Sequence, residues 1–88
     1  MYQVLVSDTF QKQYNTVSKE MQKRIKKGLK ELEKDPFNPR SGADIKPVKD
    51  TNPQKHRLRV GEYRLIYRVE GPKIKMVELF LRGRGYRD

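Results

Sequence analysis

The sequence contains no cysteine and no tryptophan, and it has a single histidine among its 88 residues. Without cysteine, neither a disulfide framework nor a thiolate metal site forms, so nothing points to an oxidising compartment. One histidine, with acidic residues scattered among lysines, leaves no Ser-His-Asp or Cys-His pairing and no plausible metal cluster. We therefore expect no metal and no cofactor, and any chemistry must come from cations and tyrosines.

Long apolar runs are also missing. No stretch approaches the roughly 18 apolar residues of a membrane helix candidate. The first ten residues, MYQVLVSDTF, lack the charged start and the apolar core of a signal peptide. We expect a protein without a membrane segment, located in the cytoplasm.

Acidic residues are scarce relative to basic ones. The chain has 21 Lys and Arg against 11 Asp and Glu, which gives a formal net charge of +10. Such an excess attracts polyanions and is typical of nucleic-acid binding, although it carries no sequence preference. At this length we expect residues 1–88 to form a single domain with a small core.

The first half of the chain predicts one strand and two helices. A β-rich run at Tyr2–Val6 ends near Asp8, which we expect to cap a first helix, with Gln11 completing a weak capping box. Ser18 is a second N-cap candidate, and the helix after it runs from Lys19 to about Lys34. The short connection between the two helices predicts that they pack as a hairpin.

The second helix has an apolar stripe for the core and a basic side. The stripe consists of Met21, Ile25, Leu29 and Leu32. The basic side suits RNA, but the spacing of Glu20 with Arg24 and of Lys27 with Glu31 allows i, i+4 ion pairs. We therefore favour a solvated surface for this side.

The second half predicts a connection followed by three strands. Residues 35–54 contain four of the five prolines and read as a long surface loop with a short extended piece at Ile45–Val48. Strands then follow within Lys55–Val69 and Lys73–Arg82. The expected fold is α+β, with a two-helix N-terminal hairpin packed on a small, mainly antiparallel sheet in the order β-α-α-β-β-β.

The segment Lys55–Val69, KHRLRVGEYRLIYRV, alternates with period two on both sides of Gly61-Glu62 and predicts a hairpin. A two-residue turn pairs Val60 with Tyr63, Leu58 with Leu65 and His56 with Tyr67 on one apolar face, where His56 is a packing residue. The other face then pairs Arg59 with Arg64, Arg57 with Ile66 and Lys55 with Arg68.

Like charges that face each other across a ladder cost stability, so the basic face calls for an explanation. One interpretation is a solvated surface whose charges prevent edge-to-edge aggregation. The other is a surface that binds phosphates. Arginine dominates the ladder, and its planar donor fork matches phosphate, so we favour the second interpretation.

The last strand adds apolar residues to the predicted basic face. A three-residue turn at Glu70–Pro72 places Glu78 opposite Arg64 and puts four apolar side chains beside the arginines, namely Ile66, Ile74, Met76 and Phe80. A mixed apolar and cationic surface suits an acidic, amphipathic partner segment, which these four residues would contact. The alternative is that the loop at residues 35–54 folds back and covers them.

The order of elements, the segment LRVGEYRLIYRV and the ending LRGRGYRD resemble the RelE/ParE superfamily of toxins of type II toxin-antitoxin systems. The likeness is closer to RelE-type toxins, which are ribosome-dependent mRNA endoribonucleases (mRNA interferases). The resemblance implies an acidic, RelB-like antitoxin, the ribosome and mRNA as partners. It also implies two sets of site residues: catalytic Lys55, Arg57, Arg64, Arg82 and Tyr86, and RNA-binding Arg59, Arg68 and Arg84.

The implied chemistry is metal-independent attack of an RNA 2′-hydroxyl on the adjacent phosphate. Cations stabilise the phosphorane, and arginines around Tyr86 favour its phenolate as the base. Stacking on RNA is the other role open to Tyr86. Two departures from the family pattern stand out: Arg57 replaces a lysine, and the sequence ends at Asp88 without the C-terminal helix that some members have.

Two other functions remain open at this stage. A ParE-like toxin resembles this fold but poisons DNA gyrase and cleaves no RNA. A plain RNA- or ribosome-binding module would use the same arginines to hold phosphates without turnover.

Overall fold

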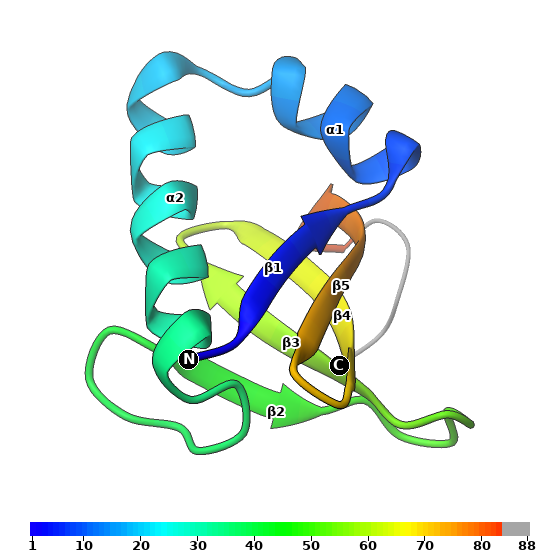
Figure 1. Ribbon diagram of the computed structural model, residues 1–88. Coiled ribbons are helices and arrows are strands. Elements are labelled where there is room, and N and C mark those ends of the chain that lie inside the picture. The colour runs from blue at the N-terminus through cyan, green and yellow to red at the C-terminus, as the bar shows by residue number, and fades with distance from the viewer. Residues whose placement is uncertain (84–88) are drawn as a thin grey trace.

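A computed structural model describes residues 1–83 of the chain as two helices on a five-stranded sheet (Figure 1). The elements are β1 (Gln3–Val6), α1 (Asp8–Asn15), α2 (Lys19–Lys34), β2 (Asp44–Pro47), β3 (Lys55–Val60), β4 (Tyr63–Glu70) and β5 (Lys73–Leu81). The strand order is β1-β5-β4-β3-β2, and only β1 pairs in parallel, with β5. The α+β class and the mainly antiparallel sheet are confirmed, and the extended piece near Ile45 becomes β2.

Both helices begin at serine caps. Ser18 caps α2 as predicted, since its Oγ accepts a hydrogen bond from Met21 N at 3.1 Å. The cap of α1 is Ser7 and not Asp8, because Ser7 Oγ accepts from Phe10 N at 3.0 Å and Asp8 is the first helical residue. Asp8 instead places its negative charge in the first turn, where the helix dipole favours it.

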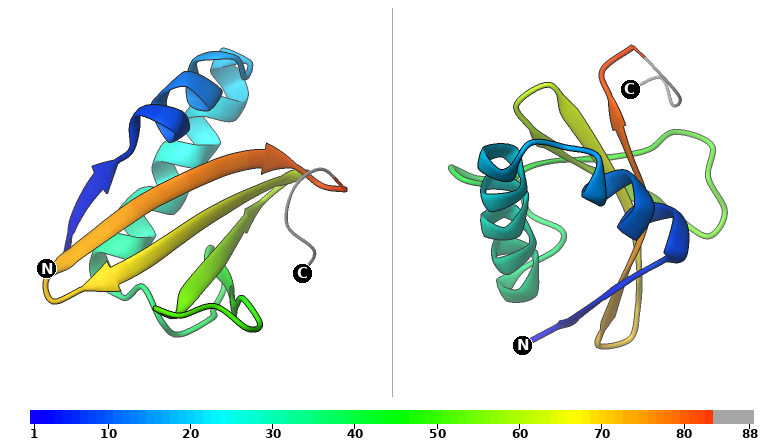
Figure 2. Two further views of the ribbon diagram at one scale, coloured as in Figure 1. Left: turned by 90° about the vertical axis from the view of Figure 1, so that its right-hand side faces the viewer. Right: turned by 90° about the horizontal axis from the view of Figure 1, so that it is seen from above.

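The two helices cover one face of the sheet, and among residues 1–83 no helix covers the opposite face (Figure 2). Ile25 and Leu32 of α2 and Phe10 of α1 are almost completely buried against the sheet. Gly28 allows α2 to approach closely, since a Cβ there would lie 2.9 Å from Leu58 Cδ2. We call the side without helices the helix-free face; it carries the side chains that alternate with the core residues of β3 and β4.

The register of β5 differs from the prediction because its turn has two residues in place of three and because the strand contains a β-bulge. Glu70 pairs with Lys73, so the turn has two residues, and pairing then continues to Tyr67 with Met76. Beyond that point Ile66 pairs with Glu78, which leaves Val77 as an extra residue. The predicted pair of Arg64 with Glu78 is therefore wrong.

The bulge also changes the face on which β5 side chains lie. Ile74 and Met76 belong to the core on the helix side, so their predicted position beside the arginines is wrong. Ile66 and Phe80 do lie on the helix-free face, where Phe80 pairs with Arg64. The turn is one residue shorter than predicted, which puts Ile74 and Met76 on the helix side, and the bulge then reverses the alternation and puts Phe80 on the helix-free face.

Side chains from the start and the middle of α1 stabilise the bulge. Ser7 Oγ donates to Val77 O at 2.9 Å, and Ser7 N donates to Met76 O at 3.0 Å. Gln13 Oε1 accepts from Leu79 N at 2.6 Å. Ser7 and Gln13 thus satisfy three backbone groups of β5 at and beside the bulge.

The loop after α2 is fastened on the helix side of the sheet. Asp35 Oδ1 accepts from Phe37 N and Asn38 N, and Arg40 donates to the carbonyls of Glu31 and Asp35. The side chain of Asn38 is the largest influence that holds the pKa of Asp35 below its usual range. These contacts tie residues 35–40 to the end of α2.

Within residues 1–83, neither helix is long and apolar enough to span a bilayer.

Candidate nucleic-acid interface

The β3–β4 hairpin places a ladder of cations on the helix-free face, with the register that the sequence predicts. Lys55 pairs with Arg68, Arg57 with Ile66, and Arg59 with Arg64. The neighbouring strands extend this surface, because β2 sets Lys46 beside Arg57 and β5 sets Lys75 beside Arg68. Five of the predicted site residues are therefore brought together on one face: Lys55, Arg57, Arg59, Arg64 and Arg68.

The arginines of this face fall into a buried pair and an exposed set. Arg57 is 4% exposed and Arg64 is 5% exposed, whereas Arg59 and Arg82 are exposed to solvent. Arg57 Nη1 lies 3.9 Å from Asp44 Oδ1. Burying a guanidinium group is costly unless it has such a partner, so the groups around Arg57 and Arg64 must stabilise their charges.

Arg82 lies beside the hairpin turn. Its backbone N–H donates to Glu62 O at 2.7 Å, and Leu81 just before it pairs with Tyr63. The sheet thus places Arg82 at the same end as Arg59 and Arg64. The predicted residues Arg84 and Tyr86 lie outside the described residues.

Arg68 is partly neutralised by an acidic neighbour. Its Nε lies 2.8 Å from Glu70 Oε2, and Lys75 Nζ lies 3.2 Å from the same oxygen. An RNA phosphate at Arg68 would therefore have to compete with a carboxylate. Within residues 1–83 Arg59 makes no ion pair, although Asp44 stands opposite it in the β2–β3 ladder, and its Nε donates to the Gly61 carbonyl at 3.4 Å.

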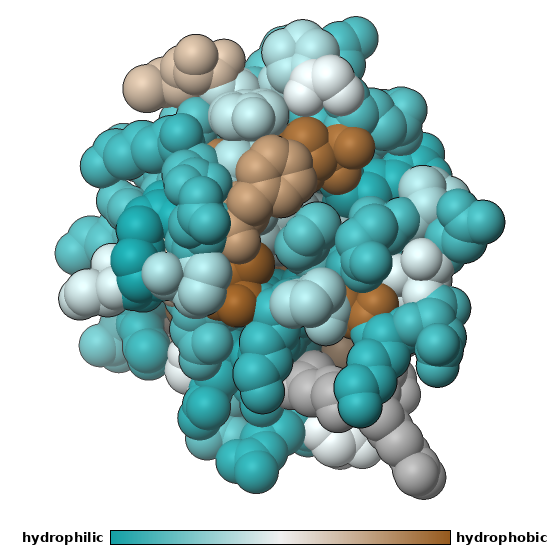
Figure 3. Space-filling model, turned by 90° about the horizontal axis from the view of Figure 1, so that it is seen from below, coloured by the Kyte–Doolittle hydropathy of each residue, from teal (hydrophilic) through white to brown (hydrophobic). Residues whose placement is uncertain are grey.

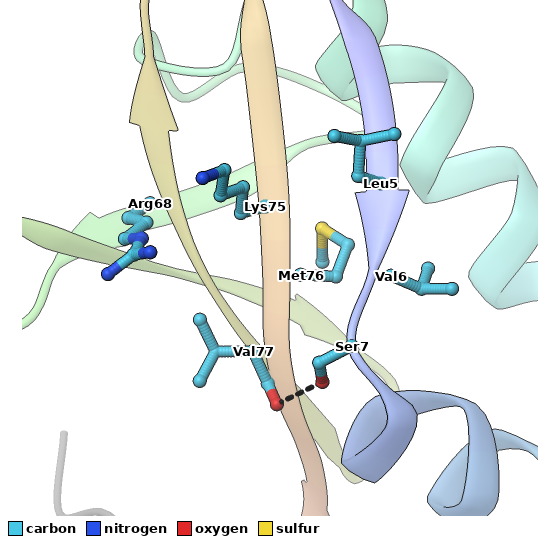
Figure 4. Close-up of a pocket in the computed structure, with 7 residues that line it drawn as sticks. All are labelled: Leu5, Val6, Ser7, Arg68, Lys75, Met76 and Val77. Carbon is cyan, nitrogen blue, oxygen red and sulfur yellow. Dashed lines mark hydrogen bonds between the residues drawn. The ribbon is translucent and has the colours of Figure 1, made fainter.

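The bulge opens an apolar pocket at the β1 edge of the sheet, with a volume of about 330 Å³ (Figure 4). Leu5 and Val6 project from β1, and Met76 and Val77 come from β5. Arg68 and Lys75 stand on the side away from β1. Sequence reasoning missed this pocket because it depends on the bulge, for which the residues of β5 give no signal.

His56 lies away from the cations, as predicted. Its ring stacks on Tyr67 at 5.6 Å and meets Phe37 edge-on at 5.5 Å. Burial lowers its pKa below the ordinary value of 6.5. Phe37 is 44% exposed. Seen from below, the surface is mainly hydrophilic, and apolar side chains show in a few separate groups (Figure 3).

The groups of this face suit anion binding. Within residues 1–83, no three His, Asp or Glu side chains are grouped to hold a metal ion. Guanidinium groups offer up to five donors in a planar fork, which matches phosphate oxygens. What the arrangement offers chemically is stabilisation of negative charge.

Comparisons with known proteins agree with this geometry. Residues 4–85 match the family model of the ParE toxin of type II toxin-antitoxin systems, parDE. A comparison with curated protein sequences found no significant match. Solved structures do match over most of the chain.

Three of these structures contain or describe RelE. A chain of the archaeal RelE-RelB complex from Pyrococcus horikoshii is 30% identical, with a TM-score of 0.80, covering 96% of this chain and 98% of that one. For the RelB-RelE complex of Methanococcus jannaschii the identity is 28%, the TM-score 0.73 and the coverage 88% of both chains. The isolated Escherichia coli RelE toxin is 16% identical, with a TM-score of 0.75 and coverage of 97% and 88%, and shows the fold alone.

The family model spans nearly the whole chain, and a relative at 30% identity shares its fold from end to end. The hairpin with its arginine ladder, which first suggested the resemblance, lies within both matches. This chain therefore belongs to the RelE/ParE superfamily of toxins of type II toxin-antitoxin systems.

Proposed function

We propose that this toxin is a ribosome-dependent endoribonuclease that cleaves translated mRNA without a metal ion. The observation that supports the proposal most strongly is the convergence of Arg57, Arg59 and Arg64 on one face of the sheet. Two of these guanidinium groups are buried, where a cation interacts with a phosphate more strongly than it does in water. A protein that merely avoids aggregation has no need of buried arginines.

The proposed reaction is transesterification within the RNA. A 2′-hydroxyl loses its proton to a base and its oxygen bonds to the adjacent phosphorus. The bond from phosphorus to the 5′-oxygen then breaks, which leaves a 2′,3′-cyclic phosphate, and the 5′-oxygen takes up a proton. Arg57 and Arg64 would stabilise the phosphorane, whose extra negative charge develops only in the transition state.

The remaining predicted residues have supporting roles. Lys55 is the ammonium group of the β3–β4 ladder and would support the leaving 5′-oxygen. Arg57 is less suited to protonate this oxygen, because a guanidinium does not readily lose its proton. Arg82 lies at the turn end of the face and would bind the scissile phosphate. Tyr86 is proposed as the base, and Arg84, with Arg59 and Arg68, as an RNA contact.

Low exposure of the central arginines agrees with dependence on the ribosome. At 4% and 5% exposure, Arg57 and Arg64 reach a phosphate only after the face opens locally. A ribosome that holds the message in a defined orientation supplies the binding energy for such an opening. Free RNA should accordingly be cleaved poorly.

Primer extension on a translated message tests the proposal directly. Parent protein should cut within codons, and Tyr86→Phe should lose cleavage while it still binds ribosomes. The matched control is Tyr63→Phe, which alters a tyrosine of the helix side and should cut at the parent rate. Cleavage by Tyr86→Phe at the parent rate would remove that residue from the mechanism, and absence of cleavage by the parent would contradict the nuclease.

The second candidate function is inhibition of DNA gyrase, which the match to the ParE family model favours. The two candidates separate in purified systems. A gyrase poison stabilises cleaved DNA in a supercoiling assay and leaves a translated message intact, whereas the nuclease does the reverse. A non-catalytic RNA-binding module would bind ribosomes and change neither readout.

We also propose a cytoplasmic complex with an acidic, RelB-like antitoxin. Support comes from the relatives that were crystallised as RelE-RelB complexes and from the net charge of +10. The apolar pocket between Leu5 and Val77, flanked by Arg68 and Lys75, fits an apolar side chain of a segment whose carboxylates meet the two cations. Ile66 and Phe80 would lie under the same segment.

This partner site is tested by introducing a negative charge at the pocket. Leu5→Glu should weaken the complex with a co-expressed acidic antitoxin, because it places a carboxylate where the partner is negative. Phe37→Glu is the matched control, since Phe37 is a similarly exposed apolar residue on another surface. Equal weakening by both variants, or by neither, would place the antitoxin elsewhere.

A further inference from the structure

A second cavity lies beside the hairpin turn at Gly61, between α2, the start of β2 and the end of β3. Its volume is about 430 Å³, within the range of about 300–1,000 Å³ typical of ligand pockets. Three of its cations come from two elements: Arg24 and Lys27 from α2, and Arg59 from β3. The cavity is separate from the apolar pocket at the β1 edge, with which it shares no residue.

Two of these cations lack the ion pairs that the sequence predicts. Glu20 with Arg24 and Lys27 with Glu31 have the spacing of helix ion pairs, yet Glu31 pairs with Lys34 at 3.0 Å and Arg40 at 3.4 Å. Within residues 1–83, Arg24 and Lys27 make no ion pair or side-chain hydrogen bond. The two suggested ion pairs are therefore absent from this part of α2, whereas the predicted solvation is confirmed, because Arg24 and Lys27 are both exposed.

The walls of the cavity hold the cations in place. Arg24 packs over the turn, since a Cβ at Gly61 would lie 3.2 Å from its Nη1 and 3.3 Å from its Nη2. Arg40 forms a rigid wall because its guanidinium donates to the carbonyls of Glu31, Asp35 and Asn38. Asp44 is the one acidic lining residue, and its carboxylate lies near Arg57.

Arg59 connects this cavity to the helix-free face. By register it belongs to the cation ladder, opposite Arg64, and it also lines the cavity beside Val60 and Gly61. A chain of phosphates bound along the ladder would therefore reach the cavity at Arg59. The cavity has more cations than carboxylates among its described lining residues, which suits a phosphodiester with its single negative charge.

We infer that the cavity formed by Arg24, Lys27 and Arg59 is a phosphate-binding site that holds a backbone phosphate of the RNA flanking the segment on the helix-free face. This site extends the proposed nuclease function and rests on it for the identity of the RNA. Its role is to fix the register of the strand, since phosphate contacts orient a nucleic acid without reading its bases.

Titration of the full chain with a uridine hexanucleotide at several salt concentrations tests this site. Arg24→Gln with Lys27→Gln should flatten the plot of log affinity against log salt by about 0.7, because the cavity holds one phosphate and each lost phosphate contact on single-stranded RNA removes about 0.7. The matched control is Lys23→Gln with Lys26→Gln, which removes the same charge from exposed positions of α2 that do not line the cavity. The control slope should remain close to the parent slope.

A second measurement locates the phosphate. The hexanucleotide should shift the amide NMR signals of Gly42 and Gly61 in the parent and in the control variant, but not in the cavity variant. Equal flattening by both double variants, or unchanged Gly42 and Gly61 signals, would overturn the site. Shifts caused by inorganic phosphate but not by RNA would assign the cavity to a free anion and also overturn the RNA occupant.

Failure of the proposed function gives a different result. A protein that binds the hexanucleotide through the cavity and yet leaves a translated message intact contradicts the nuclease and leaves the cavity assignment standing. The other outcome is that the parent cleaves the message while the cavity and control variants are equally active and equally weakened in RNA binding. That outcome contradicts only the cavity assignment.

Discussion

The hydroxyl of Tyr67 donates a 2.7 Å hydrogen bond to the carbonyl oxygen of Pro36, 31 residues earlier in the chain. Both groups are buried, so the bond ties the centre of β4 to the loop that leaves α2. Burial raises the pKa of Tyr67 well above its usual range, which keeps the phenol protonated as a donor. The helix layer and the sheet are thus joined by a polar contact as well as by apolar packing.

Tyr67→Phe should lower the free energy of unfolding by about 1–3 kcal/mol, because the Pro36 carbonyl would remain buried without its donor. Urea unfolding measures the change. Tyr63→Phe is the control, since the Tyr63 hydroxyl makes no hydrogen bond within residues 1–83, and it should stay within about 0.5 kcal/mol of the parent. Similar losses in both variants would show that the Tyr67 bond contributes little.

Stability should decline as the pH falls below about 6.5, in part through His56. Burial lowers the pKa of His56 in the folded protein, so the unfolded chain binds its proton more readily. The contribution is therefore fully present above the unfolded pKa and is lost as the pH falls towards the folded pKa. Urea midpoints measured between pH 7.5 and 5.5 should fall less steeply for His56→Phe than for the parent. A parallel decline in the two proteins would assign the pH dependence to other groups.

Gln13→Ala should destabilise the bulge in β5. Its Oε1 accepts from Leu79 N at 2.6 Å, and the variant leaves this N–H without an acceptor at a cost of about 1–3 kcal/mol. The amide of Leu79 should then exchange with deuterium faster than in the parent. Gln11→Ala is the control because Gln11 is exposed and bonds only to Asn15. Gln13→Glu retains an acceptor and should restore the slow exchange; if it does not, the bond is not what protects Leu79.

Arg59→Gln should weaken RNA binding in a salt-dependent way. Arg59 is exposed and belongs to both the ladder and the α2 cavity, so its loss should flatten the salt plot by about 0.7. Lys12→Gln removes one exposed charge from α1 and serves as the control. An Arg59→Gln slope equal to the parent slope would exclude a phosphate contact at this residue.

The β3–β4 hairpin was predictable residue by residue from the sequence. Its alternation with period two and its two-residue turn at Gly61 fix the register, so every pair from Lys55 with Arg68 to Val60 with Tyr63 is confirmed. The limits of α2 are also confirmed, because Ser18 and Asp35-Pro36 are strong helix boundary signals.

The parts that failed depend on contacts between distant residues. The bulge at Val77 is stabilised by hydrogen bonds from Ser7 to the Val77 carbonyl and from the Leu79 N–H to Gln13. Nothing within β5 distinguishes Val77 from a regular strand residue. Glu31 prefers Lys34 and Arg40 over Lys27 because the loop brings Arg40 to it. The i, i+4 spacing within the helix does not predict such a competing ion pair.

The bulge at Val77 has a consequence for aligning this chain with its relatives. Before the bulge, the core residues of β5 have even numbers, namely Ile74 and Met76. After the bulge, the core residue Leu79 has an odd number. A relative that lacks the extra residue would need a one-residue gap at this position to keep equivalent side chains in equivalent layers. An ungapped alignment would match core positions of one protein to surface positions of the other on one side of the bulge, and apparent conservation there would mislead the choice of site residues.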